Sequence, residues 1–463
     1  MTKSWQITKD SSNMNITIIG DGKVGSTLAR VLSKEDNDVI IIDKNPDVLS
    51  QNNEALEVIT IEGSGLNIKT LHEAGVENDD LVIAVTNQDE INMICCLYAK
   101  RMGAKHTVAR IRDPEHSEEV NALIDELGLD DVINPEYAAA VHISQLVLWP
   151  NVSDIELFAR NKVMLTKYKL EPDSSLIGQS LQQATIFDDA GILVAAIERG
   201  QETLIPKGDF VFQENDSVFI IGETNSVNIF LKLKNKRNNI VKDVLILGGG
   251  RISIYLAKML LHNHINVKII EQDAEICNKL SQLLPEAIII HGDGTDYELL
   301  EFEGIASAGA FISLMGHDEA NIIACLVAKA SGVPKTIAKI TRLKSTHIIE
   351  DIGVDSIVNP KLITANHILR YARNLKMKND PSINALYMMN ENDMEALEFS
   401  VEHDYPFLNI PLKQLKIHRN ALIAVIVRSG KIIIPRGEDT IQLKDSIIVI
   451  TSQPNITNLA DIF

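Results

Sequence analysis

Several residue types that mark a functional class are scarce in this sequence of 463 residues. Only four cysteines occur, Cys95, Cys96, Cys277 and Cys325, and their spacing does not form a metal-ligand set. Cys95 and Cys96 are adjacent on a predicted helix, so their side chains point in different directions. We therefore expect small buried cysteines in a reducing cytosol and no bound metal.

Positive charge and long apolar runs are also lacking. The chain has 44 Lys and Arg residues against 63 Asp and Glu residues, which gives a net charge of -19. A protein that binds the phosphates of nucleic acid needs a basic face, so the charge argues against nucleic acid as a partner. No apolar run reaches the length of about 18 residues that spans a bilayer, and residues 1–14 do not resemble a signal peptide. A membrane role would therefore come through a partner.

A glycine-rich loop near the N-terminus is the clearest motif that is present. The apolar run 16–19 leads into Gly20, Gly22 and Gly25 at G-x-G-x-x-G spacing, and an apolar-periodic segment follows. A second apolar run, 39–42, ends in Asp43. This order predicts a strand, a tight turn, a helix, a second strand and an acidic residue, which is the first half of a dinucleotide-binding unit.

Each residue of this fingerprint has a chemical reason. Gly20 permits the tight turn, Gly22 lets the backbone approach a pyrophosphate, and Gly25 lets the helix lie close to the strand. The helix N-terminus offers free N–H groups to the phosphate. Asp43 is placed to accept hydrogen bonds from ribose hydroxyls and repels a 2′-phosphate. The predicted ligand is therefore NAD-like or an adenine nucleotide rather than NADP.

Three other residues in or beside the loop qualify this interpretation. The carboxylate of Asp21 is unfavourable beside an anion unless it points to water, and Lys23 offsets its charge. Ser26 stands where a Walker loop has the lysine that reaches the β- and γ-phosphates, so we do not expect phosphoryl transfer.

Polar residues follow other predicted strands of the same unit. Thr86 and Asn87 end the apolar run 81–85, and Arg110 ends or flanks the next run, where it is suited to pair with a phosphate. Strands that are apolar on both faces and alternate with helices predict a parallel sheet covered on both sides. We expect these residues to line one crevice at the carboxyl ends of the strands.

The pattern then occurs a second time. The apolar run 244–247 leads into Gly248, Gly249, Gly250 and Arg251, and a later run ends in Glu271 where the first copy has Asp43. Ser253 replaces the third glycine, so we expect the helix and strand to lie farther apart or to twist, and nucleotide occupancy of this copy stays open.

Each copy of the nucleotide-binding unit is followed by a smaller module. Short alternating runs at 163–170, 193–198 and 218–221 predict a small α+β module of mostly antiparallel strands, and matching segments occur near the C-terminus. The predicted fold class is therefore α/β, with two Rossmann-like parallel-sheet domains, each followed by a small α+β domain, as an internal duplication. The helix predicted from residue 136 to residue 148 is unusually apolar. We expect it to pack on another domain or subunit, and burial within its own domain is the alternative.

This organisation resembles the TrkA family of potassium-uptake regulatory proteins. The resemblance is carried by the loop 20–25, Asp43, and the segments 85–92 and 109–111, and it covers nearly the whole chain after Met14. It implies RCK domains that bind NAD, NADH, ATP or ADP. It also implies a cytoplasmic protein, peripheral on the inner face of the membrane, that assembles as a dimer or tetramer ring beneath a potassium channel subunit of the TrkH type and gates it.

The resemblance also assigns segments and residues. The expected segments are a disordered extension (1–14), a first RCK N domain (15–135), a crossover helix (136–150), a first RCK C domain (151–236), a second RCK N domain (241–361), a second crossover helix (362–380) and a second RCK C domain (381–463). The implied nucleotide contacts of the first copy are Gly20, Asp21, Gly22, Lys23, Val24, Asp43, Thr86, Asn87 and Arg110. Those of the second copy are Gly248, Gly249, Gly250, Arg251, Ile252, Glu271 and Lys339.

Two other functions compete with this one. An NAD-dependent oxidoreductase with a duplicated Rossmann core would need a proton donor and a substrate pocket. However, no H-E-x-x-H, G-x-S-x-G or paired C-x-x-C motif occurs, and residues 151–240 contain no histidine. A dinucleotide-responsive scaffold without a channel partner is the second alternative. Duplicated nucleotide domains without a catalytic partner favour a sensor, and we therefore predict that the chain is not an enzyme.

Overall fold

The structure is a computed structural model, and its residues fall into two compact units. The first unit comprises Met1–Asn134 with His367–Pro381, and the second comprises Pro135–Asn366 with Ser382–Phe463. The structure describes residues 13–35, 37–49, 57–112, 128–150, 152–170, 174–200, 202–234, 241–341, 353–376, 383–389, 394–453 and 456–463. The predicted disordered extension at 1–14 therefore lies outside the described residues, apart from residues 13 and 14.

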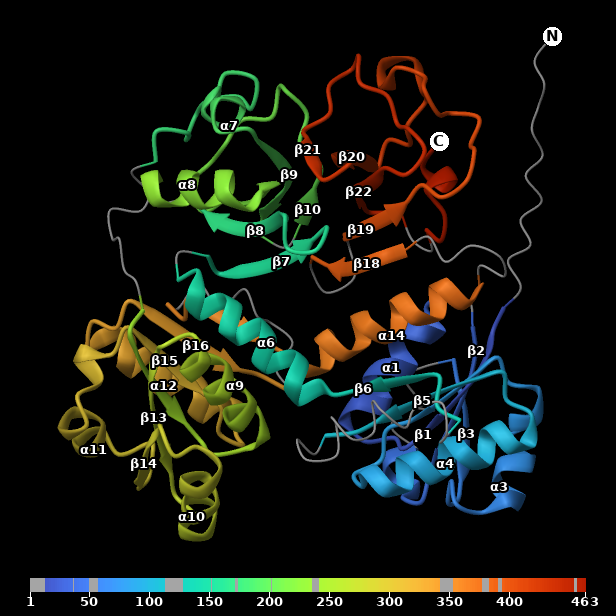
Figure 1. Ribbon diagram of the computed structural model, residues 1–463, viewed down its shortest axis with the longest axis vertical. Coiled ribbons are helices and arrows are strands. Elements are labelled where there is room, and N and C mark those ends of the chain that lie inside the picture. The colour runs from blue at the N-terminus through green and yellow to red at the C-terminus, as the bar shows by residue number, and fades with distance from the viewer. Residues whose placement is uncertain are drawn as a thin grey trace. The chain divides into compact units, whose positions relative to one another are not determined.

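The first unit is built on a parallel sheet with the strand order β3-β2-β1-β4-β5-β6. All described strand pairs of this sheet are parallel, as the alternation of apolar runs with helices predicts. All four residues of β4 are buried, because helices cover both faces of the sheet (Figure 1). Its elements are β1 (Asn15–Ile19), α1 (Lys23–Ser33), β2 (Asp38–Asp43), β3 (Ile59–Glu62), α3 (Ile68–Glu73), η1 (Val76–Asn78), β4 (Leu81–Ala84), α4 (Asp89–Met102), β5 (His106–Arg110) and β6 (Asp131–Ile133).

A second parallel sheet with the same strand order, β14-β13-β12-β15-β16-β17, lies in the second unit. The register repeats as well, since Ile19 pairs with Ile42 in the first sheet and Leu247 pairs with Ile270 in the second. Its elements are β12 (Asp243–Leu247), α9 (Arg251–His262), β13 (Asn266–Glu271), α10 (Ala274–Leu283), β14 (Ile288–His291), α11 (Tyr297–Phe302), η2 (Ile305–Ser307), β15 (Ala310–Ser313), α12 (Asp318–Ala330), β16 (Lys335–Lys339) and β17 (Ser356–Val358).

Two antiparallel sheets form the small modules, which we call the first and second C modules. The strand orders β10-β9-β11-β8-β7 and β18-β19-β22-β20-β21 have the same topology. The first C module contains β7 (Asp154–Phe158), β8 (Val163–Lys169), α7 (Ile186–Asp189), β9 (Ile192–Arg199), β10 (Glu202–Leu204), β11 (Ser217–Glu223) and α8 (Thr224–Lys234). The second contains β18 (Ile383–Met388), β19 (Glu395–Ser400), η3 (Leu412–Gln414), β20 (Ala421–Arg428), β21 (Lys431–Ile433), β22 (Ser446–Thr451) and η4 (Leu459–Ile462).

The C modules confirm the predicted antiparallel strands and add others. The runs predicted at 163–170, 193–198 and 218–221 are β8, β9 and β11, whereas β7 and β10 were not predicted. Each module repeats one ion pair, from Arg199 to the buried Asp216 and from Arg428 to the buried Asp445. The two sheets share one hydrophobic cluster, in which Phe219 of the first module and Ile448 of the second are both buried.

Two longer helices follow the Rossmann-like domains. Helix α6 (Pro135–Leu148) packs against α9 of the second Rossmann-like domain, and the rings of Tyr137 and Tyr255 meet edge to face at 5.4 Å between centroids. This packing confirms that the apolar helix covers another domain. The last part of α14 (Pro360–Lys376) belongs to the first unit, where Arg373 forms a buried ion pair with Glu35.

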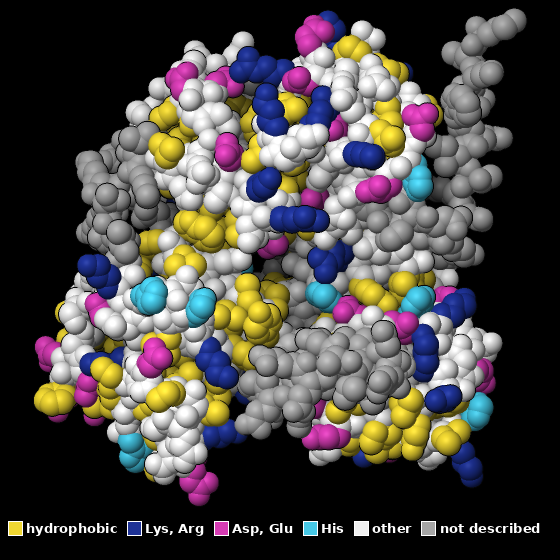
Figure 2. Space-filling view, in the orientation of Figure 1, with side chains coloured by type: hydrophobic (Ala, Val, Ile, Leu, Met, Phe, Trp, Pro, Cys, Tyr) yellow, Lys and Arg dark blue, Asp and Glu magenta, His cyan; other side chains and the backbone are white. Residues whose placement is uncertain are grey.

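The surface carries mixed charge. On the face drawn in Figure 2, Lys and Arg side chains are interspersed with Asp and Glu side chains, and exposed hydrophobic side chains lie between them. Among the described residues, no helix combines the length and the hydropathy needed to cross a membrane.

Candidate functional site

The predicted nucleotide contacts of the first copy lie at the carboxyl edge of the first parallel sheet. The glycine loop follows β1, Asp43 is the last residue of β2, Thr86 and Asn87 follow β4, and Arg110 ends β5. Strands β1 and β4 are neighbours, and chain order runs outward from them in opposite directions. Ligands of open α/β sheets bind at such a switch point, so the topology brings the predicted residues to one place.

Two glycines of the loop are required by the fold itself. Gly20 has a φ of +105°, which side-chain-bearing residues rarely adopt. A Cβ atom on Gly25 would lie 1.8 Å from the carbonyl oxygen of Gly20. These two residues therefore have the turn and packing roles that the sequence predicts.

The middle glycine has no such structural reason. Gly22 has φ -68° and ψ -173°, an extended conformation that any residue adopts. A Cβ atom built on Gly22 meets no atom of the described chain within 4 Å, and the same holds for Gly250, with φ -69° and ψ -178°. Neither backbone strain nor packing demands glycine at these positions. Glycine is a favourable N-cap residue, and it also leaves the backbone open to the close approach of a ligand.

The helix that begins after Gly22 is suited to an anion. In α1 no side chain caps the N-terminus, and the first turn contains no acidic residue; the same is true of α9 after Gly250. Helix α10, in contrast, is capped by Asp273. Lys23 and Arg251 are exposed at the first positions of α1 and α9, whereas Val24 and Ile252 are buried. Both N-termini therefore combine the positive end of the helix dipole with an exposed cation.

The acidic residue at the end of the second strand contacts the glycine loop in both copies. Asp43 Oδ2 accepts a hydrogen bond from the backbone N–H of Asp21 at 2.7 Å, and Glu271 Oε2 accepts one from Gly249 at 2.6 Å. The other carboxylate oxygen accepts from the N–H of Asn45 or Asp273. Each oxygen of these half-buried carboxylates keeps a further lone pair for a donor such as a ribose hydroxyl.

The side chain of Asp21 in the glycine loop is buried rather than exposed to water. Its carboxylate was expected to be compatible with an anion only if it pointed to water, but the residue is 1% exposed. Its backbone N–H donates to Asp43, which fixes the direction of the loop at this point. The carboxylate therefore does not point to water, as the sequence analysis required for an anion nearby. The exposed Lys23 is the loop residue that presents charge to solvent.

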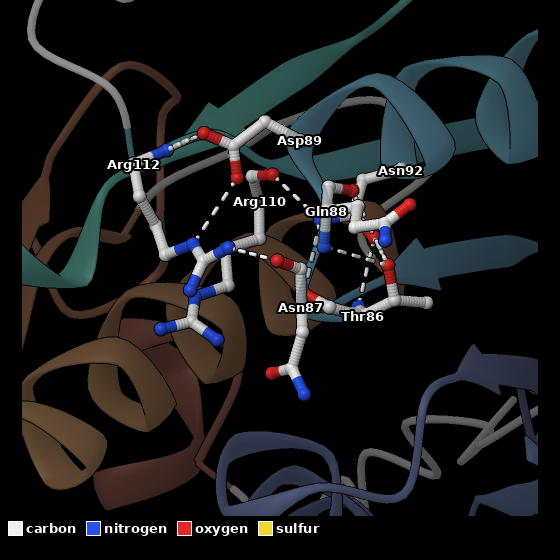
Figure 3. Close-up of polar contacts among 7 residues, drawn as sticks. All are labelled: Thr86, Asn87, Gln88, Asp89, Asn92, Arg110 and Arg112. Atoms are coloured by element: carbon white, nitrogen blue, oxygen red, sulfur yellow. Dashed lines mark hydrogen bonds and ion pairs between the residues drawn. The ribbon is translucent and has the colours of Figure 1, made fainter.

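A buried asparagine connects the strand ends beyond the loop. Asn92 Oδ1 accepts hydrogen bonds from the N–H and the hydroxyl of Thr86 at 2.8 and 2.6 Å, and its Nδ2 donates to the carbonyl of Arg110 at 2.8 Å (Figure 3). Asn92 is fully buried on α4, whereas Thr86 and Arg110 are half-buried. One side chain therefore positions two of the predicted contact residues.

An ion pair orders the loop after β4. Arg112 donates from Nε to Asp89 Oδ1 at 3.1 Å, and its Nη2 contacts the carbonyl of Asn87 (Figure 3). The backbone N–H of Arg112 donates to the same carboxylate at 2.7 Å. The exposed Asn87 is thereby held at the carboxyl edge of the sheet.

The second copy repeats this framework with different residues. Asn321 bonds to the N–H of Met315 and to the carbonyl of Lys339, and Thr341 takes the place of Arg112 against Asp318. Lys339 Nζ donates to the carbonyl of Leu314 at 2.8 Å. The lysine at the end of β16 thus contacts the backbone just after the neighbouring strand β15.

Ser253 shows how the second copy differs at the third glycine. It is fully buried, and its hydroxyl donates to the carbonyl of Gly248. The equivalent approach of Gly25 to Gly20 leaves no room for a Cβ atom, so the backbone around Ser253 differs in the second copy. Gly248 keeps a positive φ of +92°, as Gly20 does. The prediction that helix and strand lie farther apart or twist in the second copy stays a prediction.

The sequence did not identify the residues that position the site. Asn92 and Asp89 on α4 lie in the segment 85–92 that carries the resemblance, but neither they nor their counterparts Asn321 and Asp318 on α12 were predicted as site residues. The signal was present, because the pattern Asp-Glu-x-Asn follows the fourth strand of both parallel sheets.

Comparison with known proteins identifies the family. The TrkA-N domain matches residues 16–135 and 244–360, and the TrkA-C domain matches residues 165–235 and 396–463. Trk system potassium uptake protein TrkA homolog 1 of Methanosarcina mazei is 31% identical over 444 residues, which are 94% of this chain and 97% of that protein. Trk system potassium uptake protein TrkA of Vibrio alginolyticus is 30% identical over 440 residues, which are 94% and 95% of the two chains.

A solved structure shows the same fold. The GsuK channel bound to NAD superposes with a TM-score of 0.60 at 16% identity, covering 98% of this chain and 79% of that chain. The parallel sheets and the C modules have the fold of the GsuK RCK domain. The chain belongs to the TrkA family, whose members are regulatory proteins with tandem TrkA-N and TrkA-C domains rather than oxidoreductases.

Proposed function

We propose that this chain is a regulatory subunit of a potassium uptake system and that it binds NAD(H) or an adenine nucleotide at the glycine loop of its first parallel sheet. The observation that carries the proposal is the middle glycine. Gly22 and Gly250 are glycines that neither packing nor backbone conformation requires, and both lie at the uncapped N-terminus of a helix. Two copies with the same feature are best explained by a ligand that approaches the backbone.

The residues present fit a dinucleotide. The free N–H groups at the start of α1, together with Lys23, would hold the pyrophosphate, and the carboxylate of Asp43 would accept hydrogen bonds from ribose hydroxyls. Thr86 and Asn87 would contact the ligand at the end of β4, and Arg110 would pair with a phosphate. A carboxylate at the end of β2 disfavours a 2′-phosphate, which excludes NADP from the preferred ligands.

The second site would hold a nucleotide with a different set of residues. Gly248, Gly249 and Gly250 would form the loop, with Arg251 and Ile252 at the helix start. Glu271 would accept hydrogen bonds from the ribose, and Lys339 would occupy the position that Arg110 has in the first site. With Ser253 in place of the third glycine, this site would differ from the first in its preference among nucleotides.

The output of binding is a change in geometry. A nucleotide shifts an equilibrium between conformations only by its difference in affinity for them. We infer that the responding partner is a membrane potassium channel subunit of the TrkH type. The chain would sit beneath it on the cytoplasmic face as a self-associated dimer or tetramer ring. This arrangement accounts for nucleotide-binding domains in a family of Trk potassium uptake proteins.

Nucleotide binding to the purified full chain tests the proposal. We expect NAD, NADH, ATP or ADP to bind without being consumed, as measured by isothermal titration calorimetry with parallel analysis of the nucleotide. Asp43→Ala removes at least one hydrogen bond to a charged acceptor, worth about 1.5–3 kcal/mol, so affinity at the first site should fall at least roughly ten-fold. Asp43→Asn, which keeps one acceptor oxygen, should lose less.

The matched variant is Glu271→Ala, which affects only the second site. Binding that is unchanged in Asp43→Ala would reject the assigned site. Potassium flux through the co-reconstituted channel subunit, with and without nucleotide, tests the regulatory role. A flux that does not respond to the nucleotide that binds would reject gating.

A further inference from the structure

A histidine on helix α6 connects this helix to the first C module. His142 Nε2 lies 3.3 Å from Oδ1 of Asp154, the first residue of β7, and the two side chains are 14% and 31% exposed. Asp154 Oδ1 also accepts a hydrogen bond from the backbone N–H of Ile155 at 2.9 Å. The ring and the carboxylate thus meet where most solvent is excluded, and there an ion pair is screened less than at the surface.

The carboxylate of Asp154 extends the contact to the second C module. Its other oxygen, Oδ2, accepts a hydrogen bond from the hydroxyl of Tyr387, which lies on β18. Helix α6 and both C modules belong to the second unit, so these contacts are internal to it. One carboxylate therefore joins α6, β7 and β18.

The two copies use their crossover-helix histidine differently. His367 stands on α14 at the same distance from the first proline of the helix as His142 on α6. His367 Nε2 contacts Asp131 Oδ2 of β6 at 2.8 Å, within the first unit. Strand registers place Ala385 of β18 where β7 has Asp154. The histidine of α14 therefore pairs with a parallel sheet, whereas the histidine of α6 pairs with a C module.

A buried cation faces His142 from the second parallel sheet. Ser356 of β17 stands where β6 has Asp131, and its hydroxyl accepts a hydrogen bond from Lys335 Nζ at 2.8 Å. Lys335 is fully buried and also donates to the backbone carbonyl of Val152. The acid that binds His142 thus comes from the C module, and the parallel sheet on which α6 packs supplies a positive charge instead.

Several elements contribute charges that act on His142. Burial lowers its pKa, the hydrogen bond and charge of Asp154 raise it, Glu156 of β7 raises it further, and Lys335 of β16 lowers it. The resulting pKa lies above the usual value of histidine. Helix α9 faces α6 with the titratable Tyr255, whose ring meets that of Tyr137.

Asp154 stays ionised over the whole range in which His142 titrates. Burial raises its pKa, but the hydrogen bond and charge of His142, the hydroxyl of Tyr387 and the charge of Lys167 hold it at about 2. The proton on His142 therefore decides whether α6 carries a charge opposite to that of β7. An unperturbed histidine changes charge near pH 6.5, so the raised pKa moves this change to neutral pH or above.

We propose that His142 and Asp154 form a proton-dependent latch, which holds α6 against the C modules while His142 is protonated and weakens as the pH rises. The folded protein binds this proton more tightly than the open form does. The contribution of the latch is therefore complete below about pH 6.5 and is lost as the pH rises through the folded pKa. A hydrogen bond from a charged ring is stronger than one from a neutral ring, which is why the proton matters.

The latch gives the chain a second signal besides the proposed nucleotide. Helix α6 packs on α9 of the second Rossmann-like domain, and through Asp154 it is tied to β7 and β18. The proton thus controls how firmly this domain and the C modules are coupled. The latch consists of this chain's own side chains and does not depend on a bound nucleotide.

Hydrogen exchange of the full chain tests this proposal. It is measured by mass spectrometry at pH 6.5 and pH 8.5 and corrected for the intrinsic exchange rate at each pH. We expect local opening of β7 and β18 in the wild type to increase roughly ten-fold at the higher pH, because a charge-assisted hydrogen bond is lost. Strand β11, at the centre of the same C-module sheet as β7, is the internal reference and should change less.

Two variants remove the latch from opposite sides. His142→Gln and Asp154→Asn should each open β7 and β18 at both pH values and abolish the pH dependence. His367→Gln is the matched control, because it removes the equivalent histidine of the first unit and should leave the pH dependence of β7 unchanged. Circular dichroism melting confirms that each variant is folded, and if one of the two latch variants unfolds, the other carries the test.

An NMR titration of the His142 ring provides a readout that a purely structural role would not move. Asp154→Asn removes the charge that stabilises the protonated ring, so the pKa of His142 should fall. The pKa of His367, which pairs with Asp131, should not change in that variant.

Three results would overturn the proposal. These are exchange of β7 that does not change with pH in the wild type, the same pH dependence in His142→Gln as in the wild type, and opening of β11 as large as that of β7, which would indicate a general loss of stability. None of them bears on nucleotide binding, which is measured separately by calorimetry.

Discussion

Replacing Gly22 by alanine separates the ligand role of the glycine loop from its structural role. Gly22 has ordinary dihedral angles, and a Cβ atom there meets nothing within 4 Å. Alanine in place of glycine stabilises a protein by about 0.4–1 kcal/mol through the unfolded chain. As an N-cap, alanine is worse than glycine by roughly 0.5–1 kcal/mol. The two effects offset, so we expect stability to change by less than about 0.5 kcal/mol.

Nucleotide affinity should respond much more strongly. The added methyl group would occupy the space in which a pyrophosphate meets the backbone N–H groups of α1. Loss of one or two charge-assisted hydrogen bonds of about 1.5–3 kcal/mol predicts binding at least roughly ten-fold weaker. Gly250→Ala should have the same effect at the second site if that site is filled. Thermal melting and calorimetric titration with NADH measure the two quantities on the same samples.

Two other glycines supply the controls. Gly208→Ala in the first C module places a Cβ atom in ordinary contact with Gln182, so stability should rise by about 1 kcal/mol or less and nucleotide binding should not change. Gly25→Ala forces a Cβ atom to within 1.8 Å of the carbonyl of Gly20 and should lower the melting temperature markedly. Unchanged nucleotide affinity in a folded Gly22→Ala protein would refute the reasoning, because the methyl group would then have met no ligand.

Two further predictions concern buried pairs within each unit. Arg373 is 1% exposed and donates from Nε to Glu35 Oε2 at 3.0 Å. Arg373→Met should therefore destabilise the first unit by about 3–5 kcal/mol, because it leaves the Glu35 carboxylate buried without its partner. Adding Glu35→Leu should restore most of this loss, and urea unfolding measures both free energies. In the second unit, burial lowers the pKa of His142, but the hydrogen bond and charge of Asp154, 3.3 Å away, outweigh it and raise the pKa above its usual value. The pair also holds the pKa of Asp154 at about 2, although burial raises it.

The sign of the pH dependence follows from these directions. A raised pKa means that the folded protein binds the His142 proton more tightly than the unfolded chain does. Its contribution to stability is complete below the unfolded value of about 6.5 and is lost as the pH rises through the folded value. His142→Gln should therefore be more destabilising at pH 6 than at pH 9. A loss that is equal at both values would contradict the assigned ion pair.

Exposed pairs provide the comparison for the buried ones. Lys413 and Glu438 form an ion pair with side chains 52% and 78% exposed. Its removal should change the free energy of unfolding by about 1 kcal/mol or less. If removing this exposed pair lowered the free energy of unfolding as much as Arg373→Met does, burial would not explain the contribution of the Glu35–Arg373 pair to stability.

The local pattern of the sequence was sufficient for the architecture of the parallel sheets. Apolar runs that alternate with helices predicted two parallel sheets, and the glycine spacing with Asp43 placed the candidate site at their carboxyl edge. Strand β7 was missed, although Asp154–Phe158 alternates, because it lies directly after the apolar helix α6. Asp21 was judged from its charge, whereas its burial depends on how the whole loop folds.

The sequence by itself determined the duplication, the glycine loops and the acids at Asp43 and Glu271. These are local signals, since each depends on residues that are neighbours in the chain or lie at the ends of successive strands. Only the tertiary structure decided which distant residues meet. Examples are Glu35 with Arg373 in the first unit and His142 with Asp154 in the second. Such pairs leave no periodic trace, because sheet order and helix packing, rather than spacing along the chain, bring them together.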